Sequence, residues 1–137
     1  MVEILTTLRQ TLKRQGYSLT SSRQKVFEAL EHHEPQTMHE LIVACPAIDR
    51  ASVYRTIALF EKLGIIQRLQ IGWKYKLELS DAFSHHHHHL SCIRCGTVVP
   101  LPEDKLLEKK LHSLAIAQGF SPQDHQLEIR GLCSACQ

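Results

Sequence analysis

The chain has 137 residues, a formal net charge of +2 and a hydrophobic fraction of 43%. That length fits one domain or two small ones, and that apolar fraction suffices for a packed core and excludes a largely disordered chain. The sequence has no run of eighteen apolar residues, and its first sixteen residues are amphipathic, so we expect neither a membrane span nor a signal peptide. We therefore expect a cytoplasmic protein whose five cysteines are metal ligands or reactive thiols rather than disulfides.

Charge and metal-binding residue types are divided unevenly along the chain. Residues 1–79 contain eleven Lys and Arg against eight Asp and Glu, a net charge of +3, whereas residues 80–137 contain five against six, a net charge of −1. The second part also holds four of the five Cys and seven of the ten His. Two segments with different tasks are the simplest interpretation, although a net charge of +3 could also belong to an ordinary solvated surface.

Three helices are predicted in the first 45 residues. Residues 3–15 place apolar side chains at helical spacing. A second helix begins after Thr20, whose hydroxyl can cap its first turn. The third helix is short, because Thr37 and Glu40 have the spacing of a capping box and Pro46 lies in the segment that ends it.

A fourth helix is predicted from about Asp49, which can serve as its N-terminal cap. Its apolar face is formed by Val53, Ile57, Phe60 and Leu63. Its polar face carries five side chains in the first turns, which are Arg50, Ser52, Tyr54, Arg55 and Thr56. Each of these five can donate a hydrogen bond to a phosphate or to a base edge. A short helix, a tight turn and a helix of this kind form a helix-turn-helix pattern, in which the last helix reads DNA.

Residues 65–79 alternate between polar and apolar types around Gly72 and predict a two-stranded hairpin. Helices followed by a hairpin are typical of a winged-helix domain. The alternative interpretation is a small α+β domain of another kind, in which Arg50 and Arg55 are simply solvated.

Two Cys-x-x-Cys pairs lie in the second part of the chain. Four thiolates in tetrahedral geometry are the usual structural zinc site. The 37 residues between the pairs must contain structure of their own, and they predict a strand at 96–99, a helix at 106–114 and a last strand at 125–129. Two unrelated pairs of buried cysteines are the alternative, but two such spacings in one short chain favour zinc.

Five consecutive histidines precede the first cysteine pair, and the residues that follow them predict a strand. Because alternate side chains of a strand face opposite ways, His86 and His88 would point to one side and His87 and His89 to the other. One strand could then give two imidazoles to each of two metal sites, which a tag or a solvated loop would not explain. We expect His85, at the edge of the run, to be solvated.

Four segments together form a specific pattern: residues 19–23, residues 52–56 with the sequence Ser-Val-Tyr-Arg-Thr, the run from His85 to Gly96, and residues 127–133. With this pattern the chain resembles the ferric uptake regulator family of dimeric, DNA-binding, metal-responsive repressors, which includes iron, zinc, manganese and peroxide sensors. The resemblance covers nearly the whole chain. It implies an α+β fold with an N-terminal winged helix-turn-helix, residues 1–80, and a small C-terminal α/β dimerisation domain that binds metal, residues 84–137.

The resemblance also implies roles for individual residues. The family's DNA-contacting tyrosine and arginine fall on Tyr54 and Arg55, and a basic contact nearer the N-terminus falls on Arg23. The polar face of the fourth helix adds Ser52 and Thr56 as candidates. The structural zinc ligands of the family fall on Cys92, Cys95, Cys133 and Cys136.

The family's sensing site lies between the two domains and takes two ligands from the histidine run, which fall here on His87 and His89. A carboxylate before the run matches Glu78, with Asp81 as the alternative. A further ligand comes from the loop before the third helix, where this chain offers His33 or Glu34. A zinc-sensing branch often uses a cysteine in the hairpin region, and this sequence has none there.

The family's second C-terminal site implies four more ligands, which are His86, His88, Glu108 and His125. Many members have Asp where this chain has His88. The imidazole makes the site richer in nitrogen, which suits zinc or another late transition metal.

The function expected from these observations is that of a metal-responsive transcriptional repressor of metal uptake or homeostasis genes, sensing iron or zinc. It would bind double-stranded operator DNA as a homodimer, with a structural Zn²⁺ and a regulatory Zn²⁺, Fe²⁺ or Mn²⁺, and with no membrane partner and no small-molecule substrate. The alternatives are a peroxide-sensing regulator of the same family, a metal buffer that uses the histidine tract, and a metalloenzyme. The sequence has no His-Glu-x-x-His pair, and neither a buffer nor an enzyme needs the helix that reads DNA, so we expect no catalytic residues.

Overall fold

The computed structural model describes residues 2–31 and 34–137. The chain forms two compact units, Met1–His85 and His86–Gln137, which we call unit 1 and unit 2. The boundary between them falls inside the histidine run. No helix among the described residues has both the length and the apolar character needed to cross a bilayer.

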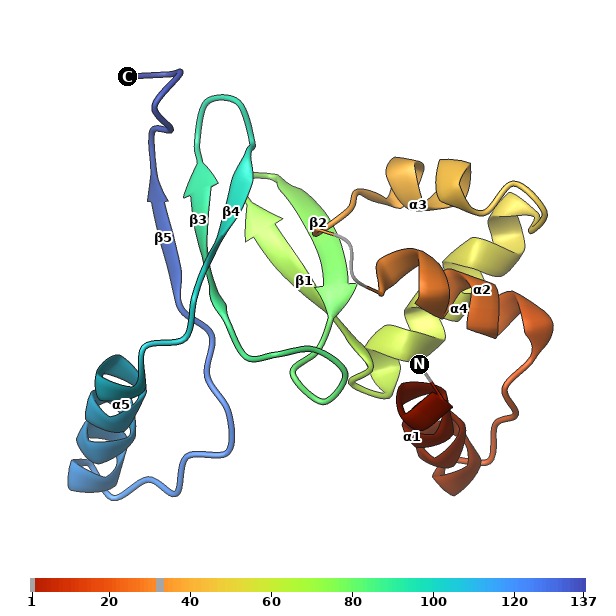
Figure 1. The fold of residues 1–137 in the computed structure, drawn as a ribbon, viewed down its shortest axis with the longest axis horizontal. Coiled ribbons are helices and arrows are strands. Elements are labelled where there is room, and N and C mark those ends of the chain that lie inside the picture. The colour runs from red at the N-terminus through yellow and green to blue at the C-terminus, as the bar shows by residue number, and fades with distance from the viewer. Residues whose placement is uncertain (1, 32–33) are drawn as a thin grey trace. The chain divides into compact units, whose positions relative to one another are not determined.

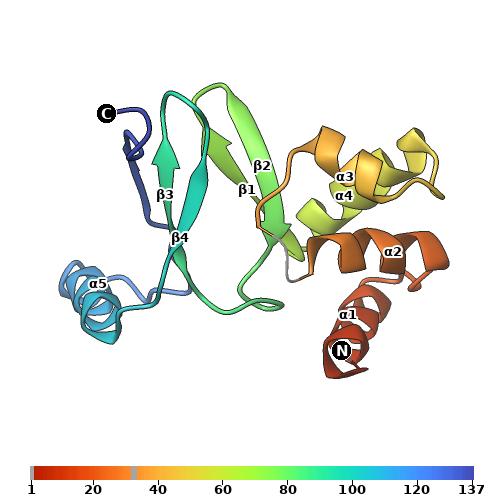
Figure 2. The same cartoon turned by 45° about the horizontal axis from the view of Figure 1, so that its top comes forward.

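The described residues of unit 1 form four helices followed by a two-stranded antiparallel sheet (Figure 1). The helices are α1 (Val2–Arg14), α2 (Ser21–Leu30), α3 (Met38–Ala44) and α4 (Arg50–Lys62). The strands are β1 (Ile66–Ile71) and β2 (Lys74–Leu79), which lie side by side in both ribbon views (Figures 1 and 2). This is the winged helix that the sequence predicts.

The three predicted helix caps are present, and each follows from a local side-chain hydrogen bond. The hydroxyl of Thr20 accepts a hydrogen bond from the backbone N–H of Arg23 at 3.2 Å. Thr37 and Glu40 form a reciprocal capping box at the start of α3. Asp49 accepts from the backbone N–H of Ser52 at 3.0 Å and caps α4. Such caps satisfy donors that the first turn leaves without an intrahelical partner.

The hairpin turns through Gly72 and Trp73, because Ile71 pairs with Lys74 across the two strands. Gly72 has a φ of 62°, in the left-handed region where a side chain would be strained. The indole of Trp73 is 86% exposed, and the ammonium of Lys74 lies 4.9 Å from the centre of its ring. The tip of the wing therefore presents an aromatic ring and a cation together.

The main apolar core lies within unit 1. Its side chains come from all four helices and both strands, and the largest fully buried ones include Phe27, Phe60, Leu8, Leu12, Leu41, Ile57 and Leu77. The buried faces of α1, α2 and α4 supply most of these residues. This core fixes α4 against α2 and so sets which side of α4 faces solvent.

Unit 2 is a three-stranded sheet with one helix. Its elements are β3 (His88–Cys92), β4 (Val98–Leu101), α5 (Lys105–Ala117) and β5 (Glu128–Gly131). The strand order is β4-β3-β5, with β3 antiparallel to β4 and parallel to β5. The last strand begins at Glu128 rather than at His125 as predicted, because its pairing with β3 starts where Glu128 lies beside His89.

Unit 2 buries little apolar surface. All of residues 86–137 are described, and among them only Cys92 and Val98 are buried hydrophobic side chains. The other buried residues of the unit are polar, namely His88, His89 and Ser91. Several large apolar side chains are exposed instead, among them Leu106, Leu114, Ile116, Phe120 and Ile129.

Candidate metal centres and nucleic-acid interface

Parallel pairing of β3 with β5 brings the two cysteine pairs together. Cys92 ends β3 and lies beside Gly131 of β5, so the turn after each strand begins at the same edge of the sheet. The backbone N–H of Ile93 also donates to the carbonyl of Gly131 at 2.9 Å. As a result the four Sγ atoms of Cys92, Cys95, Cys133 and Cys136 all lie within 4.8 Å of one another. This donor set matches a structural zinc site in which every coordination position is held by protein.

The electrostatics of the four-cysteine cluster favour a bound cation. Hydrogen bonds from the backbone N–H groups of Cys95 and Cys133 lower the pKa of the Cys92 thiol to about 6. The Thr97 hydroxyl, at 3.0 Å from Sγ, lowers the pKa of Cys95. Hydrogen bonds with the neighbouring thiols, that of Cys133 first, raise the pKa of Cys136 to about 12. The protein thus stabilises the first thiolates itself, whereas the last deprotonation needs positive charge between the sulfurs, which Zn²⁺ supplies.

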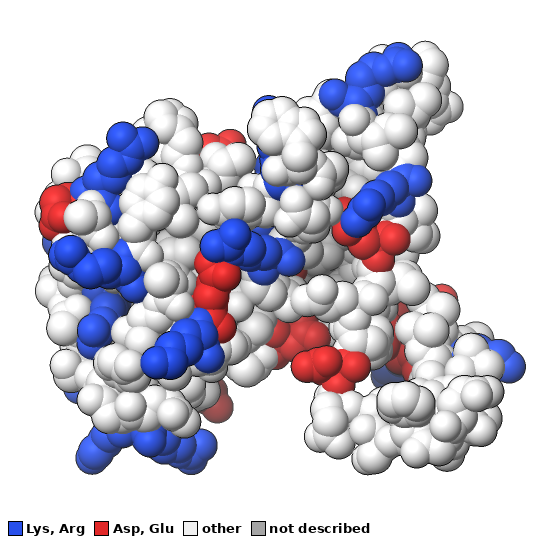
Figure 3. Space-filling model, turned by 180° about the vertical axis from the view of Figure 1, so that it is seen from behind, with Lys and Arg blue, Asp and Glu red and all other residues white. Residues whose placement is uncertain are grey.

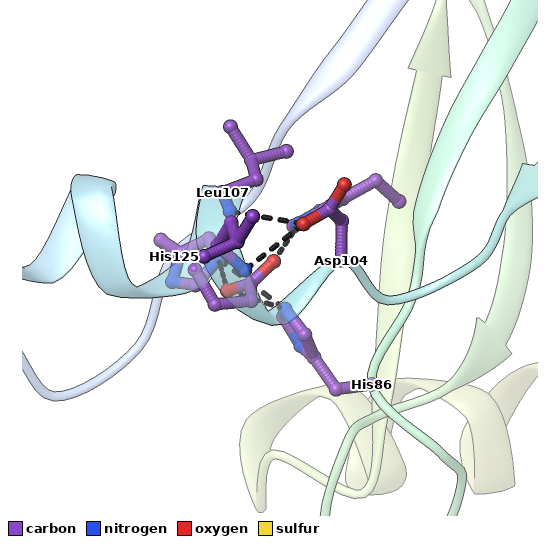
Figure 4. Close-up of polar contacts among 7 residues, drawn as sticks. His86, Asp104, Leu107 and His125 are labelled. Atoms are coloured by element: carbon purple, nitrogen blue, oxygen red, sulfur yellow. Dashed lines mark hydrogen bonds and ion pairs between the residues drawn. The ribbon is translucent and has the colours of Figure 1, made fainter.

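A second cluster gathers three imidazoles around one carboxylate. His86 precedes β3, His88 opens it, Glu108 lies in the first turn of α5, and His125 lies in the segment between α5 and β5. The Nε2 atoms of His86 and His125 are 3.2 Å and 2.6 Å from Oε2 of Glu108, and His88 Nε2 contacts Oε1. His86 and His125 point toward each other beside the start of α5 in Figure 4, with Nε2 atoms 3.2 Å apart.

The first turn of α5 is fixed by its own cap. Asp104 accepts hydrogen bonds from the backbone N–H groups of Leu106 at 2.9 Å and Leu107 at 3.2 Å (Figure 4). Glu108 follows directly, and its N–H donates to the carbonyl of Asp104 at 3.0 Å. The cap therefore holds the carboxylate where the three imidazoles meet.

Charge and burial oppose each other at Glu108. Desolvation by burial alone would raise the pKa of this carboxyl, but the hydrogen bond from His88 and the electrostatic interactions with His125, His86 and His88 together lower it. The ionised carboxylate is thus the favoured form, as a metal ligand must be. Three imidazole nitrogens with one carboxylate oxygen suit zinc and other late first-row dications.

Two further histidines of the run, His87 and His89, lie on the other side of β3. The rings of His87 and His89 pack edge to face with centroids 4.6 Å apart, as those of His86 and His88 do at 4.8 Å. The alternation predicted for an extended run is therefore present in unit 2. His85 is exposed, as expected for the edge of the run.

The other predicted sensing ligands belong to unit 1 or lie outside the described residues. Glu78 is a buried residue of β2, and its Oε1 accepts a hydrogen bond from Nε2 of Gln67 at 2.7 Å. Asp81 and Glu34 are exposed. His33 lies outside the described residues. The sequence analysis does not predict the hydrogen bond from Gln67 to Glu78. The hairpin register, which pairs these two residues, is the feature from which it could be predicted.

Of the four DNA-contacting side chains predicted on α4, three lie on its polar face and one does not. Tyr54 is 45% exposed, Arg55 is exposed and Ser52 is half-buried. Thr56 is only 6% exposed, which corrects the expectation that it lies on the polar face. It falls three residues after Val53 and four before Phe60, so helical spacing places it on the core side.

Several basic side chains lie on one face of unit 1 (Figure 3). Figure 3 shows several Lys and Arg side chains over this part of the molecule, at the left, with few acidic ones among them. Arg23 is tied into the loop between α1 and α2, because its Nη1 donates to the carbonyl of Ser18 at 2.6 Å and its guanidinium lies 5.7 Å from the Tyr17 ring centre. A polyanion would meet this surface with favourable electrostatics.

Comparison with known proteins decides the family. The sequence model of the protein family described as "Ferric uptake regulator family" matches residues 14–130 of this chain. The chain belongs to the ferric uptake regulator family. It is 33% identical over 135 residues to the "Ferric uptake regulation protein" of Legionella pneumophila, covering 93% of this chain and 97% of that protein. Members of this family are transcriptional regulators and not enzymes.

Solved structures agree with this placement in the ferric uptake regulator family. The Vibrio cholerae regulator, whose DNA-binding domains are described as rearranged, is 31% identical with a TM-score of 0.72, covering 91% of this chain and 98% of that one. The Helicobacter pylori regulator, described with three functional metal-binding sites, has a TM-score of 0.79 at 22% identity, covering 98% and 91%. Similar structures are described with iron, manganese or zinc. The family is one of metal-responsive regulators, and the two clusters of unit 2 provide side chains that could bind metal, so the two findings are consistent.

Proposed function

We propose that this protein is a metal-dependent repressor that binds operator DNA as a homodimer when a regulatory divalent metal is loaded. The proposal is carried by two features that occur together in one chain of this family. The first is a winged helix with Tyr54 and Arg55 exposed on α4. The second is a separate unit with two groups of metal-ligating side chains. A buffer or an enzyme would need only the second of these features.

The four cysteines would hold a structural zinc. They tie the turn after β3 to the turn after β5, so the metal would close the C-terminal end of unit 2. His86, His88, Glu108 and His125 would hold a second metal within the same unit. All eight ligands belong to unit 2, so neither metal would depend directly on unit 1.

The sensing metal would be held by His87 and His89 together with Glu78 and one of His33, Glu34 or Asp81. These ligands come from both units, so metal binding would favour one relative orientation of the DNA-binding unit over others. A difference in metal affinity between orientations becomes coupling to DNA, typically about 1–3 kcal/mol or roughly 5- to 150-fold in affinity. Arg23, Tyr54 and Arg55 would contact the operator, and the buried Thr56 is left out of this set.

The exposed apolar side chains of unit 2 support a homodimer. Leu106, Leu114, Ile116, Phe120 and Ile129 would otherwise remain in water, and β5 is an edge strand of its sheet. Clusters of exposed large apolar residues are typical of interfaces between protein chains. Two copies of α4 could then read two half-sites of a symmetric operator.

The test uses operator DNA selected from a random duplex library by the metal-loaded protein. Operator affinity is then titrated against buffered Fe²⁺, Mn²⁺ and Zn²⁺ for the wild type and for two double variants. His87→Ala with His89→Ala should fold, keep the cysteine-bound zinc and lose metal-stimulated DNA binding. His86→Ala with His88→Ala should keep at least part of that stimulation.

The matched control is His112→Ala, which removes an exposed histidine of α5 that belongs to none of the clusters. It should behave as the wild type. If the two double variants respond equally to metal, or if their roles are reversed, the assignment of the sensing site is wrong. If no metal changes operator affinity, the proposed function fails as a whole.

A further inference from the structure

The first turns of α4 contain a chain of hydrogen bonds that ends on Arg55. The carboxylate of Asp49 accepts two of them, from the Ser52 backbone N–H on Oδ2 at 3.0 Å and from the Ser52 hydroxyl on Oδ1 at 2.6 Å. The Ser52 hydroxyl in turn lies 3.0 Å from Nη2 of Arg55. We infer that Asp49 and Ser52 are positioning residues, which hold the Arg55 guanidinium ready for a base edge, and that Ser52 itself makes no contact with DNA.

The direction of this chain is fixed by the chemistry of its members. A guanidinium has only donors, so the Arg55 N–H must donate to the Ser52 oxygen. An ionised carboxylate has only acceptors, so the single Ser52 hydroxyl hydrogen must go to Asp49. These same hydrogen bonds from Ser52 are the main cause that lowers the pKa of Asp49 and keeps it ionised. With its hydrogen committed to Asp49, Ser52 has no donor left for a phosphate or a base.

Helix capping explains only part of this arrangement. The cap needs one carboxylate oxygen on the Ser52 N–H, and Oδ2 provides it. The contact between Oδ1 and the hydroxyl, and the contact of the hydroxyl with Arg55, add nothing to the cap. They instead restrain the end of a long side chain that lies three residues further along the same face of α4.

A restrained arginine is what direct readout of a base requires. Arginine recognises guanine through two parallel hydrogen bonds from a planar fork, so the orientation of the fork matters as well as its position. Ordering one flexible side chain on binding typically costs about 2- to 10-fold in affinity. If Ser52 already holds the guanidinium in the free protein, the cost of ordering it on DNA binding is smaller. The inference rests on the proposed function. It adds Asp49 and Ser52 as the residues that orient the DNA-contacting side chain of Arg55.

A double-mutant cycle with saturating metal separates this role from a direct contact. Ser52→Ala removes the hydroxyl but keeps the backbone N–H that the cap uses. It should weaken binding to the selected operator by about 2- to 10-fold, and in the Arg55→Ala background it should have no further effect. Ser52→Thr keeps a hydroxyl and should restore affinity. Affinity for random duplex DNA at the same salt should not change in either serine variant.

The matched control is Ser113→Ala, which deletes a helical hydroxyl in α5 that bonds the Lys109 carbonyl at 2.9 Å and should leave operator affinity unchanged. An equal loss for Ser52→Ala in both backgrounds would mean that Ser52 touches DNA itself, and would overturn the inference. No loss in the wild-type background would overturn it too. If the wild type binds no duplex at all, the proposed function fails, and the inference fails with it.

Discussion

Removal of zinc from the four-cysteine cluster should unfold unit 2 and leave unit 1 folded. Within residues 86–137 only Cys92 and Val98 are buried apolar side chains, and full burial of one such side chain contributes about 1.5–3 kcal/mol. Fixing the backbone of a single residue costs about 1–2 kcal/mol. The free energy gained from apolar burial within unit 2 therefore offsets the conformational entropy cost of ordering only a few residues.

A zinc ion held by the four cysteines would stabilise unit 2 far more than this apolar burial does. Binding to zinc-finger peptides is worth about 10–16 kcal/mol at pH 7, as much as the whole stability of a typical domain, about 5–15 kcal/mol. Unit 1 has an extensive core of its own, which includes the fully buried Phe27, Phe60 and Leu12. Loss of the metal should then separate the stabilities of the two units.

Hydrogen exchange with and without a chelator measures the stability of each unit separately. Amides of β3 and β5 should exchange faster after chelation, by about a thousandfold for each 4 kcal/mol lost, whereas amides of α2 and α4 should keep their protection. Cys92→Ser should behave like the chelated protein and contain one zinc less per chain. Cys45→Ala is the matched control, because Cys45 is buried in unit 1 and lies outside the cluster. Unchanged protection of β3 and β5 in zinc-free protein would refute the reasoning.

Two further predictions concern side chains that hold others in place. Gln67→Ala removes the hydrogen bond to Glu78 and should raise the metal concentration needed for operator binding by about 10- to 100-fold, with unchanged affinity at saturating metal, as buffered titrations would show. An unchanged metal requirement would exclude a role for Gln67. Hydrogen bonds from Ser52 lower the pKa of Asp49, so this carboxylate stabilises the fold fully above its unfolded pKa of about 3.9, and the stabilisation is lost as pH falls through the lower folded value. Asp49→Asn should therefore flatten the fall of Tm below about pH 4, and an unaltered slope would contradict this.

The features that the sequence predicted well depend on local interactions. Thr20, Thr37 and Asp49 cap helices through side chains that reach only three residues along the chain. The alternation of the histidine run needed only the period of a strand. Local rules of this kind apply before the tertiary fold is known.

The misses have two different causes. The start of β5 at Glu128 depends on pairing with β3, far away in sequence, and no local pattern contains that register. The burial of Thr56 is predictable from the sequence, because its spacing from Val53 and Phe60 places it on the core side of α4. Position on a helix indicates burial here more reliably than the polar character of the residue does.

The wing has a practical consequence for spectroscopy. Trp73 is the single tryptophan of the chain and lies at the hairpin turn, with its indole almost fully in water and the Lys74 ammonium over its ring. Emission excited selectively in tryptophan therefore changes little when the core melts, since the indole is already hydrated. The same emission reports locally on the wing, and any molecule that covers the turn should shift or quench it. The protein thus contains an intrinsic fluorophore for ligands that approach this turn, with no label attached.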